Sequence, residues 1–131
     1  MVGLVAITPS AGFVTISQSI LIGGLGALVS YTAIRLKNRT KIDDTLDVFP
    51  SHGIAGMFGM IATAVFAKDV GLVYGQTDTF VVHMVALIAV FAFTFIVSIL
   101  LYKISNKLIP LRVDKELETF GLDQSQHNEQ Y

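Results

Sequence analysis

The chain contains no cysteine and no tryptophan, and charged residues are scarce. Without cysteine, disulfides and thiolate metal sites are excluded. Charged residues make up 15% of the 131 positions and hydrophobic residues 53%, which is too little charge to cover the surface of a soluble domain. The net charge of −1 gives no reason to expect nucleic acid as a partner. The composition therefore indicates a membrane protein.

Charge is absent from three long stretches, residues 2–34, 48–67 and 79–102. About 20 helical residues cross the hydrocarbon core of a bilayer. The pattern predicts an all-α membrane protein with three transmembrane helices, at about 15–36, 46–67 and 80–102. We assign 1–13 to the end of a preceding helix and an external turn, 14–104 to the transmembrane region, and 105–131 to a polar tail.

The nine basic residues predict the orientation of the chain. All but Lys68 lie either between the first two spans or after the third. These are Arg35, Lys37, Arg39 and Lys41, then Lys103, Lys107, Arg112 and Lys115. The positive-inside rule places both groups in the cytoplasm. We expect a multi-pass protein of the cell (inner) membrane, in contact with lipid, with a cytoplasmic C-terminal tail.

Small residues at helical spacing mark the first span. Gly23, Ala27 and Ser30 recur on one predicted face. Small side chains allow membrane helices to approach each other closely. We interpret this face as a packing surface rather than a ligand site.

The second span contains an ionisable residue, His52, in an otherwise uncharged run. Such a residue is costly inside a membrane, and its default interpretation is functional. His52, Gly56, Gly59 and Thr63 are spaced to share one face of an α-helix. A neutral imidazole offers one donor and one acceptor, which suits relaying a proton or polarising a small molecule. The alternative is a buried histidine with satisfied hydrogen bonds.

Acidic residues gather just before this span, at Asp43, Asp44 and Asp47. Asp44 or Asp47 can cap the helix that follows. Metal binding or acid–base catalysis is the alternative, but no set of ligands with suitable spacing accompanies them. The sequence also lacks a nucleophile elbow and a phosphate-binding glycine loop. We therefore predict loop ordering and capping, no metal, no cofactor and no enzyme activity.

Several segments together resemble the C-terminal part of ammonium transporters of the Amt/Rh family. They are Gly3–Gly12, Asp43–Phe49, His52–Gly53 with Gly56, Leu111–Val113 and Gly121–Asp123. The similarity covers essentially the whole chain, in the correct order. It departs at Pro50 and Pro110, where the family often has glycine.

The resemblance implies that the spans are the last three of an eleven-helix ammonium transporter fold that takes up nitrogen as ammonium or ammonia. Family members form homotrimers with one hydrophobic pore in each subunit, and two histidines relay the proton of ammonium. His52 matches the second of these histidines, and Val48 matches an apolar pore position. We expect Gly53, Gly56 and Gly59 to serve helix packing in the pore wall. The first histidine belongs to earlier helices, which this chain lacks.

The resemblance also extends to the tail. Gly121, Asp123 and Ser125 match a regulatory segment, and the family suggests a PII-type signal protein as a partner. Because three helices cannot enclose such a pore, we expect a fragment, a truncated gene product or one piece of a longer chain. Two other functions remain open, namely an ammonium-sensing membrane protein and a small autonomous three-helix membrane subunit.

Overall fold

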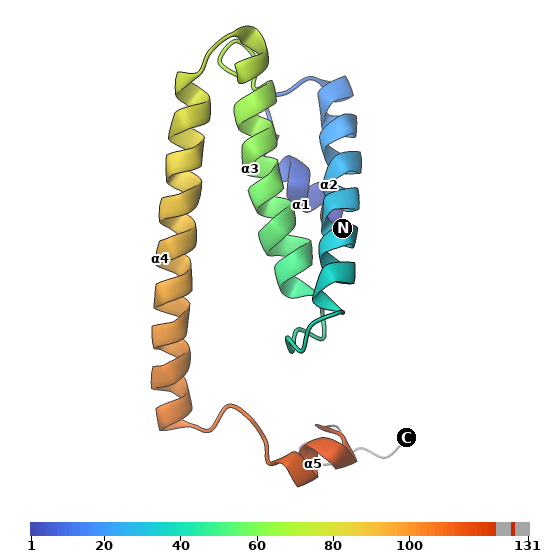
Figure 1. Ribbon diagram of the computed structural model, residues 1–131, viewed down its shortest axis with the longest axis vertical. Helices are drawn as coiled ribbons and strands as arrows, with labels where there is room; N and C mark the ends of the chain where they lie inside the picture. The colour runs from blue at the N-terminus through green and yellow to red at the C-terminus, as the bar shows by residue number, and fades with distance from the viewer. Residues whose placement is uncertain (123–126, 128–131) are drawn as a thin grey trace. The chain divides into compact units, whose positions relative to one another are not determined.

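The computed structural model describes residues 1–122 and residue 127, and most of them are helical (Figure 1). The elements are α1 (Val2–Ile7), η1 (Thr8–Ser10), α2 (Ile16–Lys37), η2 (Phe49–Ile54), α3 (Ala55–Phe66), η3 (Leu72–Tyr74), α4 (Asp78–Leu108) and α5 (Lys115–Phe120). Of these, η1 and η3 are 3-10 turns and η2 is a π-helical turn. The chain divides into two compact units, Met1–Val90 and Phe91–Tyr131.

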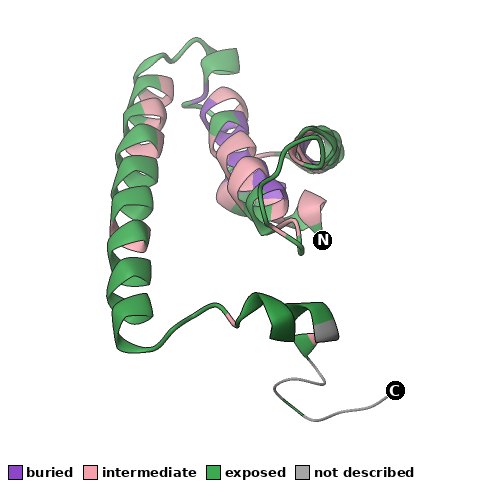
Figure 2. Ribbon diagram, turned by 60° about the horizontal axis from the view of Figure 1, so that its bottom comes forward, coloured by how far each residue is buried: buried purple, intermediate pink, exposed green. Residues whose placement is uncertain are grey.

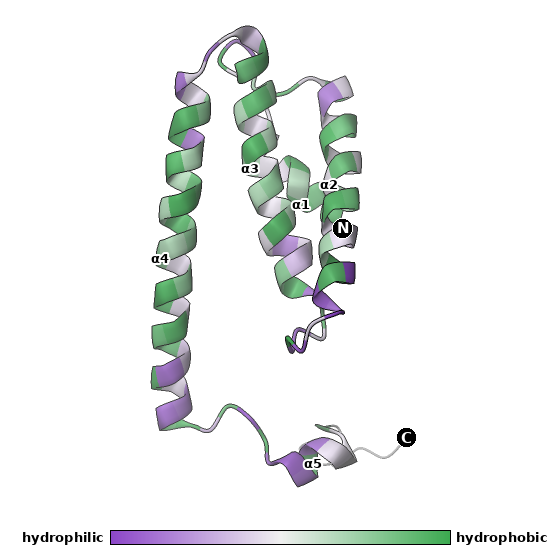
Figure 3. Cartoon of the chain, viewed as in Figure 1, coloured by the Kyte–Doolittle hydropathy of each residue, from purple (hydrophilic) through white to green (hydrophobic). Residues whose placement is uncertain are grey.

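Three helical segments are long and apolar enough to cross a membrane, which confirms the predicted all-α fold with three spans. They are Ile16–Lys37, Phe49–Phe66 and Asp78–Leu108. In Figure 3 hydrophobic residues cover most of α4, and hydrophilic residues gather toward its C-terminal end. The helix is longer than its predicted span because these polar turns continue the helical backbone beyond the apolar stretch.

A capping box begins α2. The side chain of Thr15 accepts a hydrogen bond from the Gln18 N–H (3.4 Å), and the Gln18 side chain accepts one from the Thr15 N–H (2.8 Å). This reciprocal pair satisfies two N–H groups at the helix start. At the other end, Arg35 and Lys37 lie in the last turn, where positive charge complements the helix dipole.

The short helix α1 packs against both α2 and α3 (Figure 1), and its Ala6 is fully buried. A glycine on each long helix allows this contact. A Cβ added at Gly26 would lie 2.3 Å from the Ala6 Cβ, and one added at Gly59 would lie 2.3 Å from the Ala6 carbonyl oxygen. The backbones of α2 and α3 therefore approach α1 closely, as small residues permit for helices in membranes.

The packing face predicted for the first span is partly wrong. The buried residues of α2 are Ile22, Gly26 and Ser30, whereas Ala27 is exposed. The contact with Ala6 requires a residue without a side chain, and Gly26 meets that requirement. The face that packs is therefore centred on Gly26 rather than on Ala27.

A buried polar contact joins η1 to α3. The Thr63 hydroxyl donates to the Gly59 carbonyl oxygen (2.8 Å), so the Ser10 hydroxyl is left to donate to Thr63 across 2.8 Å. Each hydroxyl carries one proton, which determines this direction. Nearby, the Lys68 N–H donates to the Phe13 carbonyl oxygen (2.7 Å). Together these bonds attach the segment after α1 to the end of α3.

Buried residues gather on α3 in Figure 2, and α4 has none. Buried apolar side chains in the described chain are mostly alanines, with Ile22 as the largest. Within α4, Phe91 and Phe95 stack with ring centroids 6.2 Å apart. The core thus relies on close backbone contact rather than on large side chains.

Candidate functional site

His52 lies in the π-helical turn η2, at the start of the second span. Its side chain is exposed, and so is that of Val48, which immediately precedes the turn. Turns of π-helix are rare, and within α-helices they often lie at functional sites. The two predicted pore residues are therefore presented by one short segment whose backbone differs from that of a regular α-helix.

The backbone of this turn is held by hydrogen bonds from outside it. The Ser30 hydroxyl of α2 donates to the carbonyl oxygen of buried Pro50 (2.9 Å). The Ser51 N–H donates to the Asp47 carbonyl oxygen (3.0 Å), and the Ser51 hydroxyl donates to the same oxygen. Pro50 has no N–H of its own. The position of His52 thus depends both on α2, through Ser30, and on Asp47, which precedes the turn.

The predicted shared face of the second span is divided in the structure. Gly59 and Thr63 are buried against α1 and η1, whereas His52 is exposed and a Cβ added at Gly56 would meet nothing within 4 Å. The prediction assumed α-helical spacing, but π-helical i→i+5 bonds change the spacing around His52. A Cβ added at Gly53 would lie 2.9 Å from the Phe49 ring, so this glycine accommodates a neighbouring side chain.

Asp44 binds the first free N–H groups of the second span. Its two carboxylate oxygens accept from the Val48 N–H (2.9 Å) and the Phe49 N–H (3.0 Å). The bond from Val48 is the main cause that lowers the pKa of Asp44. The Phe49 bond and the positive charge of Lys37 act in the same direction, while burial opposes them. The carboxylate therefore acts as an N-terminal cap in its ionised form.

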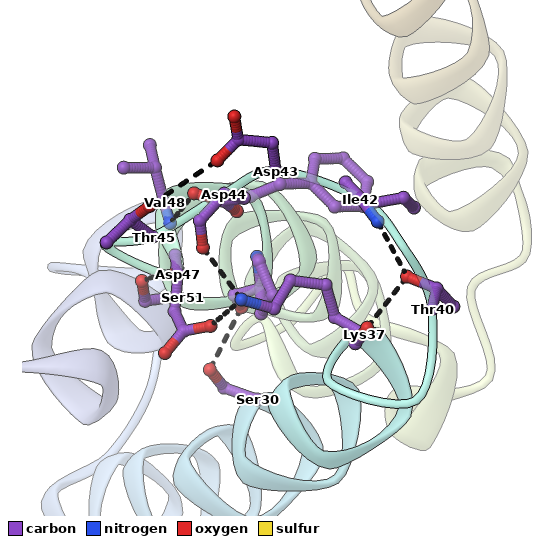
Figure 4. Close-up of polar contacts among 12 residues, drawn as sticks. Ser30, Lys37, Thr40, Ile42, Asp43, Asp44, Thr45, Asp47, Val48 and Ser51 are labelled. Carbon is purple, nitrogen blue, oxygen red and sulfur yellow. Dashed lines mark hydrogen bonds and ion pairs between the residues drawn. The ribbon is translucent and has the colours of Figure 1, made fainter. Parts of the chain in front are cut away.

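Asp47 and Lys37 form an ion pair beside this cap (Figure 4). The Lys37 Nζ lies 2.6 Å from Asp47 Oδ1, and it also donates to the Asp44 carbonyl oxygen (2.7 Å). Asp47 has a φ of 52°, a left-handed conformation that Asp tolerates better than most residues. Asp43 accepts a hydrogen bond from the Thr45 hydroxyl (3.4 Å). The acidic residues thus order the loop that enters the second span.

We expect that Asp44→Asn lowers the thermal unfolding midpoint by a few degrees at neutral pH, because the ionised cap is lost. The sign of the pH dependence follows from the lowered pKa of Asp44. The stabilisation is present above the unfolded pKa, about 3.9, and is lost as pH falls through the lower folded value. The difference between the wild type and Asp44→Asn should therefore shrink toward about pH 3.

The measurement is thermal unfolding in detergent across this pH range. Asp69→Asn is the matched control, because Asp69 is an exposed acidic loop residue outside the cap and Asn tolerates its positive φ. A stability difference for Asp44→Asn that does not change with pH would contradict the capping role.

In the tail, Gly121 ends α5 with a φ of 92°. Asp114 stands at the N-cap position of this helix. Arg112 and Glu118 form an ion pair at 2.7 Å across its first turn. The predicted regulatory residues Asp123 and Ser125 lie outside the described residues.

Lys37, Ser30 and Ala6 support the site, and sequence reasoning did not predict these roles. In the sequence, Lys37 is one of several basic residues, and Ser30 is one of several small residues of the first span. Neither pattern predicts a contact with the loop or with the turn that carries His52. The burial of Ala6 between two glycines carries no local signal at all. In the part of the chain that the structure describes, no three His, Cys, Asp or Glu residues are grouped so as to hold a metal ion.

Comparisons with known proteins agree with the resemblance. A family model described as the Ammonium Transporter Family matches residues 1–131. An ammonium transporter of Bacillus subtilis is 43% identical over 97% of this chain, and ammonium transporter Amt1 of Archaeoglobus fulgidus is 37% identical over 97%. The crystal structure of Saccharomyces cerevisiae Mep2 matches 88% of the chain with a TM-score of 0.80 and 29% identity.

These matches cover only part of the relatives. The chain spans 33% of the Bacillus protein, 34% of the Archaeoglobus protein and 29% of the Mep2 chain. It therefore corresponds to about a third of the length of the proteins that it resembles.

Proposed function

The chain belongs to the ammonium transporter family, and we propose that its helices form part of the wall of a pore for ammonium or ammonia. The observation that carries this proposal is the match of the family model to residues 1–131. The family is one of membrane transporters and not of enzymes, in agreement with the sequence prediction. The remaining wall would come from regions that the relatives possess outside the matched third.

We propose that His52 relays the proton of ammonium in this pore. Three features support the role: the imidazole is exposed, it lies in a π-helical turn, and no Asp, Glu, Lys or Arg occurs from residue 48 to 67. An N–H bond of ammonium breaks as its proton binds the acceptor nitrogen of the ring, which leaves neutral ammonia. The other ring nitrogen then releases its proton to the next group, and the ring is again neutral.

The other predicted residues have supporting roles in this proposal. Val48 provides an apolar surface beside the imidazole. This surface excludes water, which would otherwise compete for the proton. Of the three glycines in this part of the wall, Gly59 permits the close contact with α1, Gly53 accommodates the Phe49 ring, and Gly56 faces open space in the described chain. The loop at the mouth of the pore is ordered by its acidic residues, Asp43, Asp44 and Asp47.

The distribution of basic residues supports an orientation with the 38–47 loop and the tail in the cytoplasm. We further propose that the full-length transporter is a homotrimer in the cell membrane, and that a PII-type signal protein binds its tail. Light scattering of the purified transporter tests the first proposal. A binding assay with the tail deleted tests the second.

Transport itself is tested by growth. A strain without ammonium transporters should grow on low ammonium when it produces the whole gene product that carries residues 1–131. The same strain with an empty vector should fail to grow, and both should grow equally on glutamine. Absence of growth on low ammonium, with the protein present in the membrane, would contradict the proposed function.

A further inference from the structure

A lysine at the end of α2 is connected to the turn that carries His52. Lys37 is the last residue of α2, and its side chain is only 14% exposed. Its Nζ binds the Asp44 carbonyl oxygen at 2.7 Å and Asp47 Oδ1 at 2.6 Å (Figure 4). One ammonium group thus joins α2 to two points of the loop that leads into the second span.

Asp44 and Asp47 are both hydrogen-bonded to the backbone just before His52. The Asp44 carboxylate accepts hydrogen bonds from the N–H groups of Val48 and Phe49. The Asp47 carbonyl oxygen accepts a hydrogen bond from the N–H of Ser51. Three N–H groups that precede His52 are therefore bound by the two residues that Lys37 holds.

The ion pair also explains how the loop keeps an unfavourable backbone conformation. Asp47 adopts a φ of 52°, a left-handed conformation that is sterically costly for most residues and less favourable for Asp than for glycine. Its Oδ1 is buried, and a buried carboxylate oxygen without its cation would favour another loop conformation. Lys37 provides this cation and stabilises the loop in the observed form.

We propose that Lys37 is a positioning residue for His52. By binding Asp44 and Asp47 together, it sets where the π-helical turn begins and hence where the imidazole lies in the pore. This inference rests on the proposed relay role of His52. Proton relay requires hydrogen-bond distances, and a displacement of about 1 Å can lower a rate by about 100-fold.

Lys37→Met tests the inference, because methionine keeps much of the apolar side chain and removes the charge. The measurement is ammonium-driven current of the full-length transporter on a supported membrane, divided by the amount of folded protein. We expect the maximal current to fall about 10-fold or more. The half-saturating ammonium concentration should stay within about twofold of the wild type, because Lys37 binds the loop and not the substrate.

Lys41→Met is the matched control. Lys41 lies in the loop that follows α2 and is exposed, so this change removes an equal charge without breaking the ion pair. We expect its current per folded transporter to equal that of the wild type. An equal loss in both variants would overturn the proposal, since the charge of the loop rather than the ion pair would then set the rate.

Asp47→Asn tests the same ion pair from the other side. Asparagine tolerates the left-handed conformation but carries no charge. We expect a loss of current similar to that of Lys37→Met, and a double variant no worse than either single one, because both changes break one interaction. Additive losses would show that the two residues act separately and would overturn the proposal.

The outcomes separate this inference from the proposed function. If His52→Ala loses current and Lys37→Met does not, only the positioning role fails. If Lys37→Met lowers only the amount of folded protein, with current per folded transporter unchanged, the lysine is merely structural and the positioning role fails. If His52→Ala keeps full current, the relay role fails and the positioning role fails with it.

Discussion

His52→Ala is expected to lower ammonium-driven current by about 100-fold or more in the full-length transporter, which corresponds to the usual contribution of a group that transfers protons. Alanine removes both ring nitrogens and leaves the neighbouring hydrogen bonds of Pro50 and Ser51 in place. The fold should therefore survive the change. Current on a supported membrane, with the protein quantified in the same vesicles, measures the effect.

His83→Ala is the matched control for this result. The His83 ring Nδ1 lies 2.9 Å from the Thr79 carbonyl oxygen, one turn earlier in α4, which is consistent with a local structural role. We expect this variant to keep most of the current. Wild-type current in His52→Ala, at wild-type protein levels, would contradict the relay role.

Gly59→Ala is expected to destabilise the protein by about 3 kcal/mol, at the upper end of the usual cost of overpacking. The added Cβ would lie 2.3 Å from the Ala6 carbonyl oxygen, and a backbone atom cannot rotate out of the way. Gly56→Ala is the control, because a Cβ there meets no described atom within 4 Å. It should be neutral or stabilise by up to about 1 kcal/mol through helix propensity.

A second substitution distinguishes the two contacts of Ala6. The added Cβ of Gly26→Ala would lie against the Ala6 Cβ, whereas that of Gly59→Ala would lie against the Ala6 carbonyl oxygen. Ala6→Gly should therefore partly rescue Gly26→Ala and leave Gly59→Ala unimproved. Thermal unfolding of the purified variants in detergent measures both effects, and rescue of both variants alike would contradict the described contacts.

The three spans could be predicted because they depend only on how charged and apolar residues are distributed along the sequence. Gaps in charge, such as residues 79–102, correspond directly to helices long enough to cross a bilayer. His52 could be singled out for a similar reason, since an ionisable residue in an apolar run is visible without coordinates. Its relay role remains a prediction.

The surroundings of His52 could not be predicted from spacing. The π-helical turn at Phe49–Ile54 replaces i→i+4 bonds with i→i+5 bonds, and Ser30 on another helix helps to hold it. The face that packs on α2 was misplaced for a related reason. Only the approach of Ala6 makes Gly26, rather than Ala27, the residue that must lack a side chain.

Asp47 combines two requirements that few amino acids meet together. Its φ of 52° favours glycine, asparagine or aspartate, and its contact with Lys37 requires a carboxylate. Glycine would relax the backbone and lose the charge, asparagine would keep the backbone and lose the charge, and glutamate would keep the charge at a steric cost. A saturation library at this position, selected for growth on low ammonium, should therefore return aspartate almost alone.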